Sequence, residues 1–196
     1  MKKRKLLSIL LAASVAVFSI SAVASAEGTG ADNIDPAAAP EYKEATNEFF
    51  ANGTPITINA ATSEGKTATI TWDGGSQEID ENDTVYGGSD TTASNIHLAS
   101  TSITMNGGTV YNITGGNKTK NEKACDYSII DQVTLDINGG VITLGVYGID
   151  NQNTAFGTDV RKELNGKSYK NYRIGNRDVS IDGATVNSFR GVTSYA

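Results

Sequence analysis

The sequence predicts an all-β chain folded as a parallel β-helix, a solenoid of about three to five β-rungs. The prediction rests on two observations. A strand–turn–strand pattern occurs three times, as ITMNGGTV from residue 103, LDINGGVI from residue 135 and VSIDGATV from residue 179. When the three copies are aligned on their Asn/Asp-Gly turn, like residue types share the same positions. Successive rungs of a β-helix require this, because equivalent residues lie above one another.

The chain begins with a pattern typical of a secretory signal peptide. Residues 1–5 are MKKRK, an apolar stretch rich in Leu, Val and Ala follows, and Ala24-Ser25-Ala26 offers a cleavage site. We expect cleavage after residue 26 and a protein that is secreted or held at the cell surface. No second long apolar run follows, so no membrane span is expected in the cleaved chain. A signal retained as an anchor is the alternative.

Charge and cysteine content restrict the partners and the covalent chemistry. Cleavage removes four of the 16 basic residues and none of the 22 acidic ones, which leaves a net charge of −10. We therefore expect no nucleic-acid partner, because phosphate binding needs clustered cations. The single cysteine, Cys125, excludes an intrachain disulfide, and it is interpreted as a buried small side chain, a free thiol or an intermolecular link.

Two short segments are expected before the repeats. Residues 27–40 are interpreted as a flexible leader, because they are small, acidic and interrupted by two prolines. Residues 41–53 are predicted to form a short amphipathic helix, since Tyr42, Ala45 and Phe49 are spaced three and four apart. We expect this helix to cap the N-terminal end of the solenoid and to cover its edge.

Residues 54–196 are predicted to form the β-helix repeats. Their short alternating runs are rich in Thr, Val and Ile and end in Gly, Asn or Asp. The aligned copies predict three columns of stacked residues: apolar Ile103, Leu135 and Val179; apolar Met105, Ile137 and Ile181; and polar Thr104, Asp136 and Ser180.

A structural turn ladder of Asn106, Asn138 and Asp182 is expected at one corner, with side chains bonding from rung to rung. A glycine follows each of the three and would supply the positive φ that a tight corner needs.

The copies begin 32 and 44 residues apart, which predicts constant rungs with polar excursions of variable length at one corner. These excursions contain four aromatic residues that we consider candidate ligand contacts: Tyr127, Phe156, Tyr169 and Tyr172. Their rings could stack on sugars or on a protein partner. Packing back onto the wall of the solenoid is the alternative.

The segments ITMNGGTV, DTVYGGSD and LDINGGVI resemble rung cores of the right-handed parallel β-helix proteins that bacteria export, especially their adhesin-like surface members. The resemblance covers residues 54–196 and rests on the repeated pattern rather than on a diagnostic motif. It implies adhesion, a structural role or ligand binding without catalysis, with a polysaccharide or a host or cell-surface protein as partner. The last rung stops halfway round at RGVTSYA, so we also expect a chain truncated at its C-terminus, or a last rung that pairs with a partner.

A carbohydrate-active β-helix enzyme is the alternative function, either a polysaccharide lyase or a glycoside hydrolase, or the N-terminal fragment of one. Such enzymes need paired carboxylates, or an acid beside a base, on the outer wall. Asp136 and Asp178 fall on different rungs there, and Arg161, Arg173 or Arg177 could supply the base.

No catalytic, cofactor-binding or metal-binding residue is predicted. The lone His97 provides neither a catalytic triad nor a zinc site with several histidines, and we expect it to be structural or exposed. The stretch DENDT over residues 80–84 carries oxygen ligands suited to calcium, but it lacks the spacing of an EF-hand loop.

Overall fold

The computed structural model describes residues 34–91, 95–118, 128–147, 161–164, 167–170 and 172–190, and it describes side chains in these ranges except over residues 161–175. The described chain is all-β. Its one helical element is a single 3-10 turn, η1 (Glu44–Thr46).

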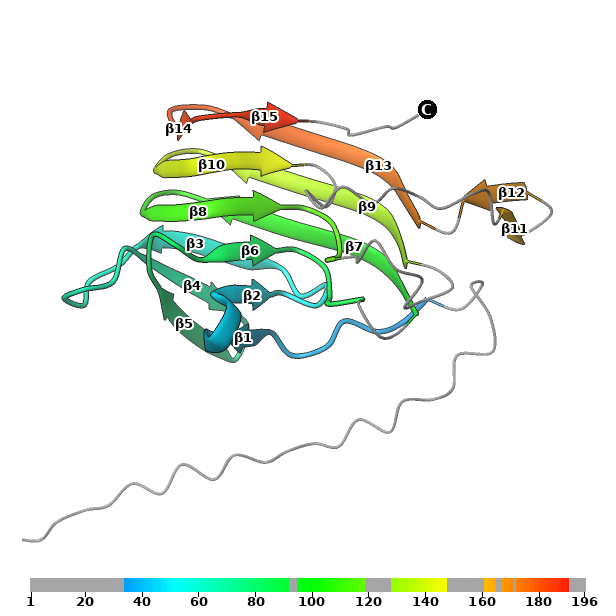
Figure 1. Cartoon of the computed structure of the whole chain (residues 1–196), viewed down its shortest axis with the longest axis horizontal. Helices are drawn as coiled ribbons and strands as arrows, with labels where there is room; N and C mark the ends of the chain where they lie inside the picture. Colours follow the sequence, from blue (N-terminus) through cyan, green and yellow to red (C-terminus); the bar gives the residue numbers. More distant parts are fainter. Residues whose placement is uncertain are drawn as a thin grey trace, which may run out of the picture.

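Two mixed sheets pack against each other and enclose the core (Figure 1). The first sheet has the spatial order β13 (Tyr172–Ile181), β9 (Ser128–Ile137), β7 (Ile96–Met105), β3 (Ile56–Ala60), β4 (Ala68–Trp72) and β5 (Gly75–Ile79). The second has the order β1 (Glu41–Lys43), β2 (Glu48–Phe50), β6 (Thr84–Tyr86), β8 (Thr109–Thr114), β10 (Val141–Tyr147) and β14 (Thr185–Val186), with β15 (Phe189–Arg190) also beside β10. A separate antiparallel hairpin joins β11 (Arg161–Leu164) to β12 (Lys167–Lys170).

The chain passes alternately from one sheet to the other. We call each such passage a repeat: β7 with β8 is the first, β9 with β10 the second, and β13 with β14 and β15 the last. Within each sheet, strands of neighbouring repeats are parallel. Antiparallel pairs occur among the described strands only at the other end of the stack, where β1 pairs with β2, β3 with β4 and β4 with β5, and in the separate hairpin.

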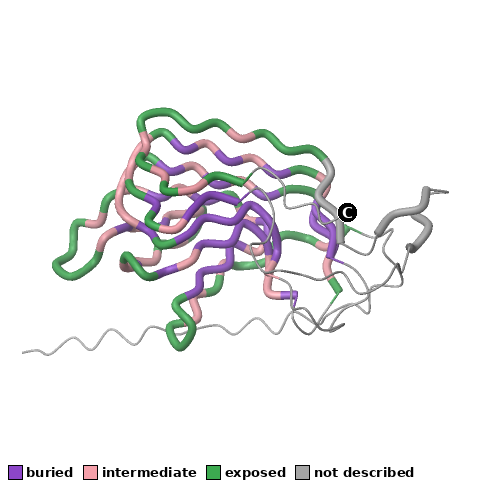
Figure 2. Tube along the Cα trace, turned by 45° about the horizontal axis from the view of Figure 1, so that its top comes forward, coloured by how far each residue is buried: buried purple, intermediate pink, exposed green. Residues whose placement is uncertain are grey.

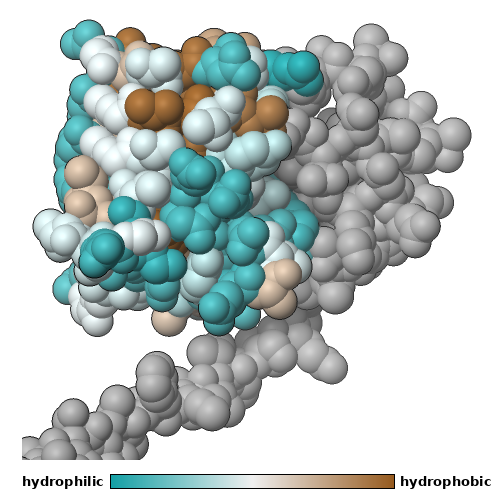
Figure 3. Space-filling view, turned by 60° about the vertical axis from the view of Figure 1, so that its left-hand side comes forward, coloured by the Kyte–Doolittle hydropathy of each residue, from teal (hydrophilic) through white to brown (hydrophobic). Residues whose placement is uncertain are grey.

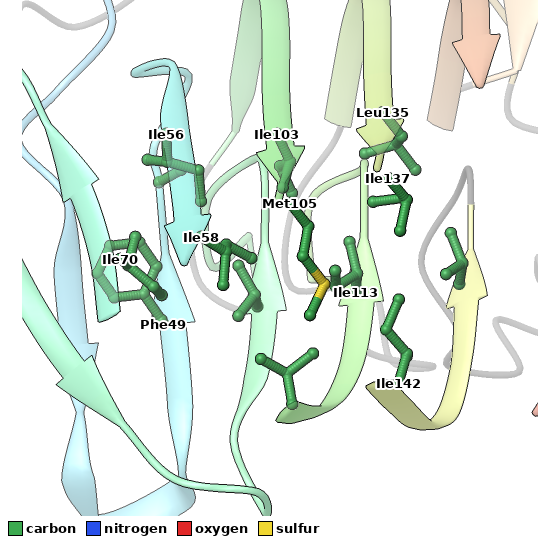
Figure 4. Packing of buried hydrophobic residues seen from close by; sticks show 14 of the residues in the cluster. Phe49, Ile56, Ile58, Ile70, Ile103, Met105, Ile113, Leu135, Ile137 and Ile142 are labelled. Atoms are coloured by element: carbon green, nitrogen blue, oxygen red, sulfur yellow. The ribbon is translucent and has the colours of Figure 1, made fainter. Parts of the chain in front are cut away.

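The register between repeats stacks like residues on like residues, as the aligned sequence copies predict. Ile103 pairs with Leu135, which pairs with Val179, and Met105, Ile137 and Ile181 form the next column. Strand β3 extends both columns with two further isoleucines at positions 56 and 58. Figure 4 shows the members of these columns from β3, β7 and β9 in the core between the sheets: Ile56, Ile58, Ile103, Met105, Leu135 and Ile137. Full burial of each such side chain stabilises the fold by about 1.5–3 kcal/mol.

The second sheet closes the core from the opposite side. Phe49, Val85, Ile113 and Val146 occupy one column of paired positions, and each is fully buried. Trp72 lies half-buried at the edge of this core, where its ring centroid is 5.7 Å from that of Phe49. The two sheets therefore share one apolar interior.

The helix predicted for residues 41–53 is wrong. These residues form β1, η1 and β2, and Tyr42 pairs directly with Phe49 across an antiparallel pair. The spacing that fits a helical face therefore arises from a hairpin, closed by Asn47 in the left-handed conformation (φ 54°). Burial of Phe49 in the shared core outweighs local helix propensity, and the segment lies at the edge of the second sheet as two strands of three residues each rather than as a helix.

The second half of the leader predicted for residues 27–40 is bonded to the rest of the fold, whereas residues 27–33 lie outside the described part. The amide of Asp35 donates to the carbonyl of His97 (2.6 Å), and the amide of Ala38 donates to the carbonyl of Asn52 (3.1 Å). Thr54 Oγ1 also donates to the carbonyl of Ala38 (2.8 Å). Backbone hydrogen bonds thus hold the second half of this segment against β7 and β2, despite its prolines and small residues.

The predicted excursions are shorter than the sequence suggests. Strand β9 already begins at Ser128 and β13 at Tyr172, so each has ten residues. These extra residues continue the parallel pairing with the start of β7. Arg177, predicted in a loop, consequently lies within β13, paired with the buried Val133.

The glycines at the corner are required by close backbone approach as well as by conformation. Positive φ occurs at Gly108 (91°) and Gly140 (96°), the second glycine of each pair, and at Gly183 (70°) in the last repeat. The sequence predicts the positive φ at the glycine directly after each Asn instead. A Cβ at Gly108 would lie 2.8 Å from the carbonyl oxygen of Thr67 and 2.9 Å from that of Asn59. The corner therefore admits no side chain at this position.

Replacement of Gly108 by alanine tests this packing. Gly65→Ala is the matched control, because Gly65 also has positive φ (77°) but has nothing within 4 Å of an added Cβ. We expect the control to lower the free energy of unfolding by about 1–2 kcal/mol from conformational strain alone. Gly108→Ala should lower it by about 3 kcal/mol or more, because the backbone of two other strands must also move. Equal losses in a urea titration would contradict the close approach.

Candidate functional site

The outer surface of the first sheet carries a regular array of small polar side chains. On each of its six strands, two outward-facing residues at alternate positions are Ser, Thr, Asn, Asp or Glu. We call this surface the polar face, and it consists of Ser76, Glu78, Thr69, Thr71, Thr57, Asn59, Ser102, Thr104, Thr134, Asp136, Asp178 and Ser180.

The strand register fixes the spacing of the polar face. One row crosses four strands through Thr57, Thr104, Asp136 and Ser180, at intervals of about 4.8 Å. A second row consists of Ser102, Thr134 and Asp178. Threonine and serine hydroxyls both donate and accept hydrogen bonds, so rows of them suit a ligand that repeats its own hydroxyl groups.

An amide ladder borders the polar face at the corner. Asn138 Nδ2 donates to Asn106 Oδ1 (3.3 Å), and Asn106 Nδ2 donates to Asn59 Oδ1 (3.3 Å). Asp182 continues this column through its backbone amide, which donates to the carbonyl of Ile137 (2.8 Å). Asn138 also donates to Asp136 Oδ2 (3.3 Å), which links the ladder to the polar face.

Asn59 is a member of the ladder that the sequence analysis missed. It follows Ile58 as Asn106 follows Met105, so the resemblance of ITIN to ITMN was the available signal. No glycine follows Asn59, because the chain continues there into β4 and β5 instead of turning the corner.

No side-chain contact is described for the four aromatic candidates. Tyr127 and Phe156 lie outside the described residues. Tyr169 lies in β12 and Tyr172 begins β13, but their side chains also fall outside the described part. Cys125 lies outside the described residues as well.

The acidic stretch at residues 80–83 folds around its own carboxylates. Asp83 is fully buried; its Oδ2 accepts the amide of Asp80 (2.7 Å), and its Oδ1 accepts the hydroxyl of Tyr42 (3.0 Å). Asp80 Oδ1 accepts the amide of Asn82 (2.9 Å). Asp83 therefore holds β1 in place, because its side chain joins Tyr42 of β1 to the start of β6.

Two ion pairs on the second sheet were not foreseen from the sequence. Lys118 Nζ is 2.6 Å from the carboxylate of Glu48, and Lys43 Nζ is 2.9 Å from Asp90 Oδ2. Both ammonium groups lie over the ring of Phe50, at 4.9 Å for Lys43 and 5.9 Å for Lys118. The hydrogen bond to Asp90 raises the pKa of Lys43. These charges act in structural contacts between strands far apart in the sequence.

His97 is structural and buried, at 7% exposure. Its backbone amide donates to Asp35 Oδ2 (2.7 Å), and its ring Nε2 is 3.1 Å from Asp131 Oδ2. The histidine therefore fastens the residue 35 segment and β9 to the start of β7.

The described residues contain no cluster of three or more His, Cys, Asp or Glu side chains that could hold a metal ion. In the same part of the chain, no helix has the length and apolar character needed to cross a membrane. No family model, no curated protein and no solved structure matches this chain.

The contact between Tyr42 and Asp83 predicts a late phase in an alkaline titration. Burial, together with the hydrogen bond to Asp83, raises the pKa of Tyr42 to about 12, against an ordinary value of about 10. The neutral phenol therefore stabilises the fold below pH 10, and this contribution is lost as the pH rises from 10 to 12. Tyrosinate absorbance should show the late phase in the native chain and in a Tyr111→Phe control, and Tyr42→Phe should remove the amplitude of one tyrosine from that phase.

Proposed function

We propose that this chain is an exported parallel β-helix, or β-solenoid, that serves as a non-catalytic adhesion or structural module at the cell surface. In-register parallel pairing of successive repeats supports the solenoid, because it stacks like residues in continuous columns from β3 to β13. The basic start, apolar stretch and Ala24-Ser25-Ala26 site support export.

The polar face carries the functional part of this proposal. It offers rows of hydroxyl, amide and carboxylate groups at equal intervals along the stack, with the core residues between them fixing their positions. A polymer with repeated hydroxyl groups can bond to several rows at once, and many weak hydrogen bonds then act together. We infer that a polysaccharide is the ligand, with a host or cell-surface protein as the other partner class.

Buried carboxylates elsewhere in the described residues favour a structural role. Glu48 is paired with Lys118, and Asp83 accepts hydrogen bonds from Tyr42 and from the backbone. Each joins strands from different parts of the chain. These two carboxylates therefore stabilise the fold.

Export predicts a defined N-terminus. When the chain is expressed with residues 1–26 in a secreting bacterium, the product outside the cytoplasm should begin at Glu27. N-terminal sequencing or intact-mass measurement checks this. Ala26→Pro is the control variant, because it blocks the small-x-small site and should leave the longer chain uncleaved.

Glycan binding should depend on the hydroxyls of the polar face. A glycan array identifies the best polysaccharide, and calorimetry then compares the native chain with a Thr104→Val, Thr134→Val double variant. Each lost hydrogen bond is worth about 0.5–1.5 kcal/mol, so we expect affinity to fall about tenfold or more. Thr185→Val is the matched control, since Thr185 is exposed on the second sheet. Equal loss in the control, or no binding to any glycan, would count against the proposal.

One observation favours a carbohydrate-active enzyme as the second candidate. Asp136 and Asp178 occupy neighbouring strands in diagonal positions of the polar face. Strand geometry puts these two positions about 8 Å apart. Inverting glycosidases separate their two carboxylates by about 6.5–9.5 Å. Release of reducing ends from a polysaccharide by the native chain, abolished in both Asp136→Asn and Asp178→Asn, would establish this function in place of the first.

A further inference from the structure

Among the described residues, nothing covers the core at the last repeat. Ile181 is 39% exposed and Phe189 51%, whereas their neighbours in the same columns, Ile137 and Val146, are fully buried. Figure 2 shows the contrast: the described part of the last repeat is green and pink, and the buried positions lie in the repeats beneath it. In Figure 3, hydrophobic atoms gather toward this end of the described surface. Apolar side chains exposed in a contiguous group mark an interaction surface.

The backbone of this end is also unpaired among the described residues. Strand β13 is the terminal strand of the first sheet, and it pairs with β9 on one side only. A ten-residue edge of this kind presents a row of N–H and C=O groups to any strand that can align with it. The end therefore offers the two features that already join each repeat to the next, which are backbone pairing and stacked apolar columns.

Charge distinguishes this end from the opposite one. The charged side chains described on the last repeat are two of each sign: Arg177, Arg190, Asp178 and Asp182. The segment that forms the opposite edges, residues 41–82, has exposed Glu41, Glu44, Glu64, Asp73 and Glu81 against exposed Lys66. Two copies would repel each other at the acidic end. The last repeat carries no such excess of acidic residues, since its described charges balance and Arg173 adds a basic residue to β13.

We propose that the open end of the last repeat docks a second copy of this chain. Antiparallel pairing of the two β13 strands about a two-fold axis perpendicular to the sheet keeps inward residues inward and puts the same patch on both sides of the interface. Ile181 and Phe189 of each copy are then covered by the other copy. This inference rests on the stacking of repeats and is independent of the proposed glycan binding.

Arg177 limits the strength of this association. It occupies an inward-facing column in which its neighbours are Val133 and Thr101, both buried. A charged side chain that points inward at the edge of a sheet weakens pairing with a further strand, because it must be desolvated. The dimer is therefore reversible and dependent on concentration.

Two variants and the native chain test the proposal, on the purified exported chain, by sedimentation velocity over a range of concentrations. The native chain should form a reversible dimer. Ile181→Asp should weaken the dimer at least tenfold, because it places a charge in the apolar contact. Arg177→Val should strengthen it at least tenfold, because it completes the column of Thr101 and Val133.

Two controls separate this contact from other effects. Arg190→Val removes an arginine of the same repeat, whose guanidinium lies 5.9 Å from the ring centroid of Tyr147. This variant should not show the tenfold increase in dimer affinity expected for Arg177→Val. Tyr111→Asp changes an exposed apolar side chain on β8, away from the last repeat, and should leave the dimer intact. A native chain that stays monomeric at all concentrations overturns the proposal, as does a dimer that Ile181→Asp leaves unchanged. A monomer that binds only a strand of another protein also overturns it.

Discussion

In-register parallel pairing between neighbouring repeats is the constraint on which the rest of the structure depends. Because equivalent residues lie directly beside one another, each position along the chain becomes a column across the sheet. An aliphatic column fills the interior, as at Ile103 and Leu135, and the alternate positions produce the rows of the polar face. A shift of one residue would exchange the two surfaces, so burial of the aliphatic columns also fixes the geometry of the exposed hydroxyls.

The corners follow from the same constraint. Neighbouring strands must turn at the same height, so the turns stack as closely as the strands do. This leaves no space for a Cβ at Gly108 or Gly140, where the nearest atoms belong to neighbouring strands and to the turns beside them. It also brings Asn106 and Asn138 within hydrogen-bonding distance. In the Asn-Gly-Gly sequence, the Asn thus supplies the side-chain hydrogen bond and the glycines permit the close backbone approach at the same corner.

Much of the fold could be predicted from the sequence, because alternation and the repeated Asn/Asp-Gly turn report directly on strands and register. The central strands are examples, and so are the columns through Ile103 and Met105. The segment around Phe49 could not be predicted in this way, since a hairpin and a helix both accommodate its apolar spacing and only the shared core decides between them. The pairing of Glu48 with Lys118 likewise joins residues 70 positions apart, and no local pattern reports it. The hydroxyl rows of the polar face were visible only in part, as the column of Thr104, Asp136 and Ser180.

The ion pair between Glu48 and Lys118 has a mechanical consequence. The contacts between repeats described above join adjacent strands, so a pull on residue 190 would peel the stack one repeat at a time from that end. The Lys118 side chain instead spans β6 and reaches β2 from the segment that follows β8. Under tension, the strands from β2 to β8 would therefore unfold together. The extension released in that step would be larger than the extension released by each repeat that unfolds before it.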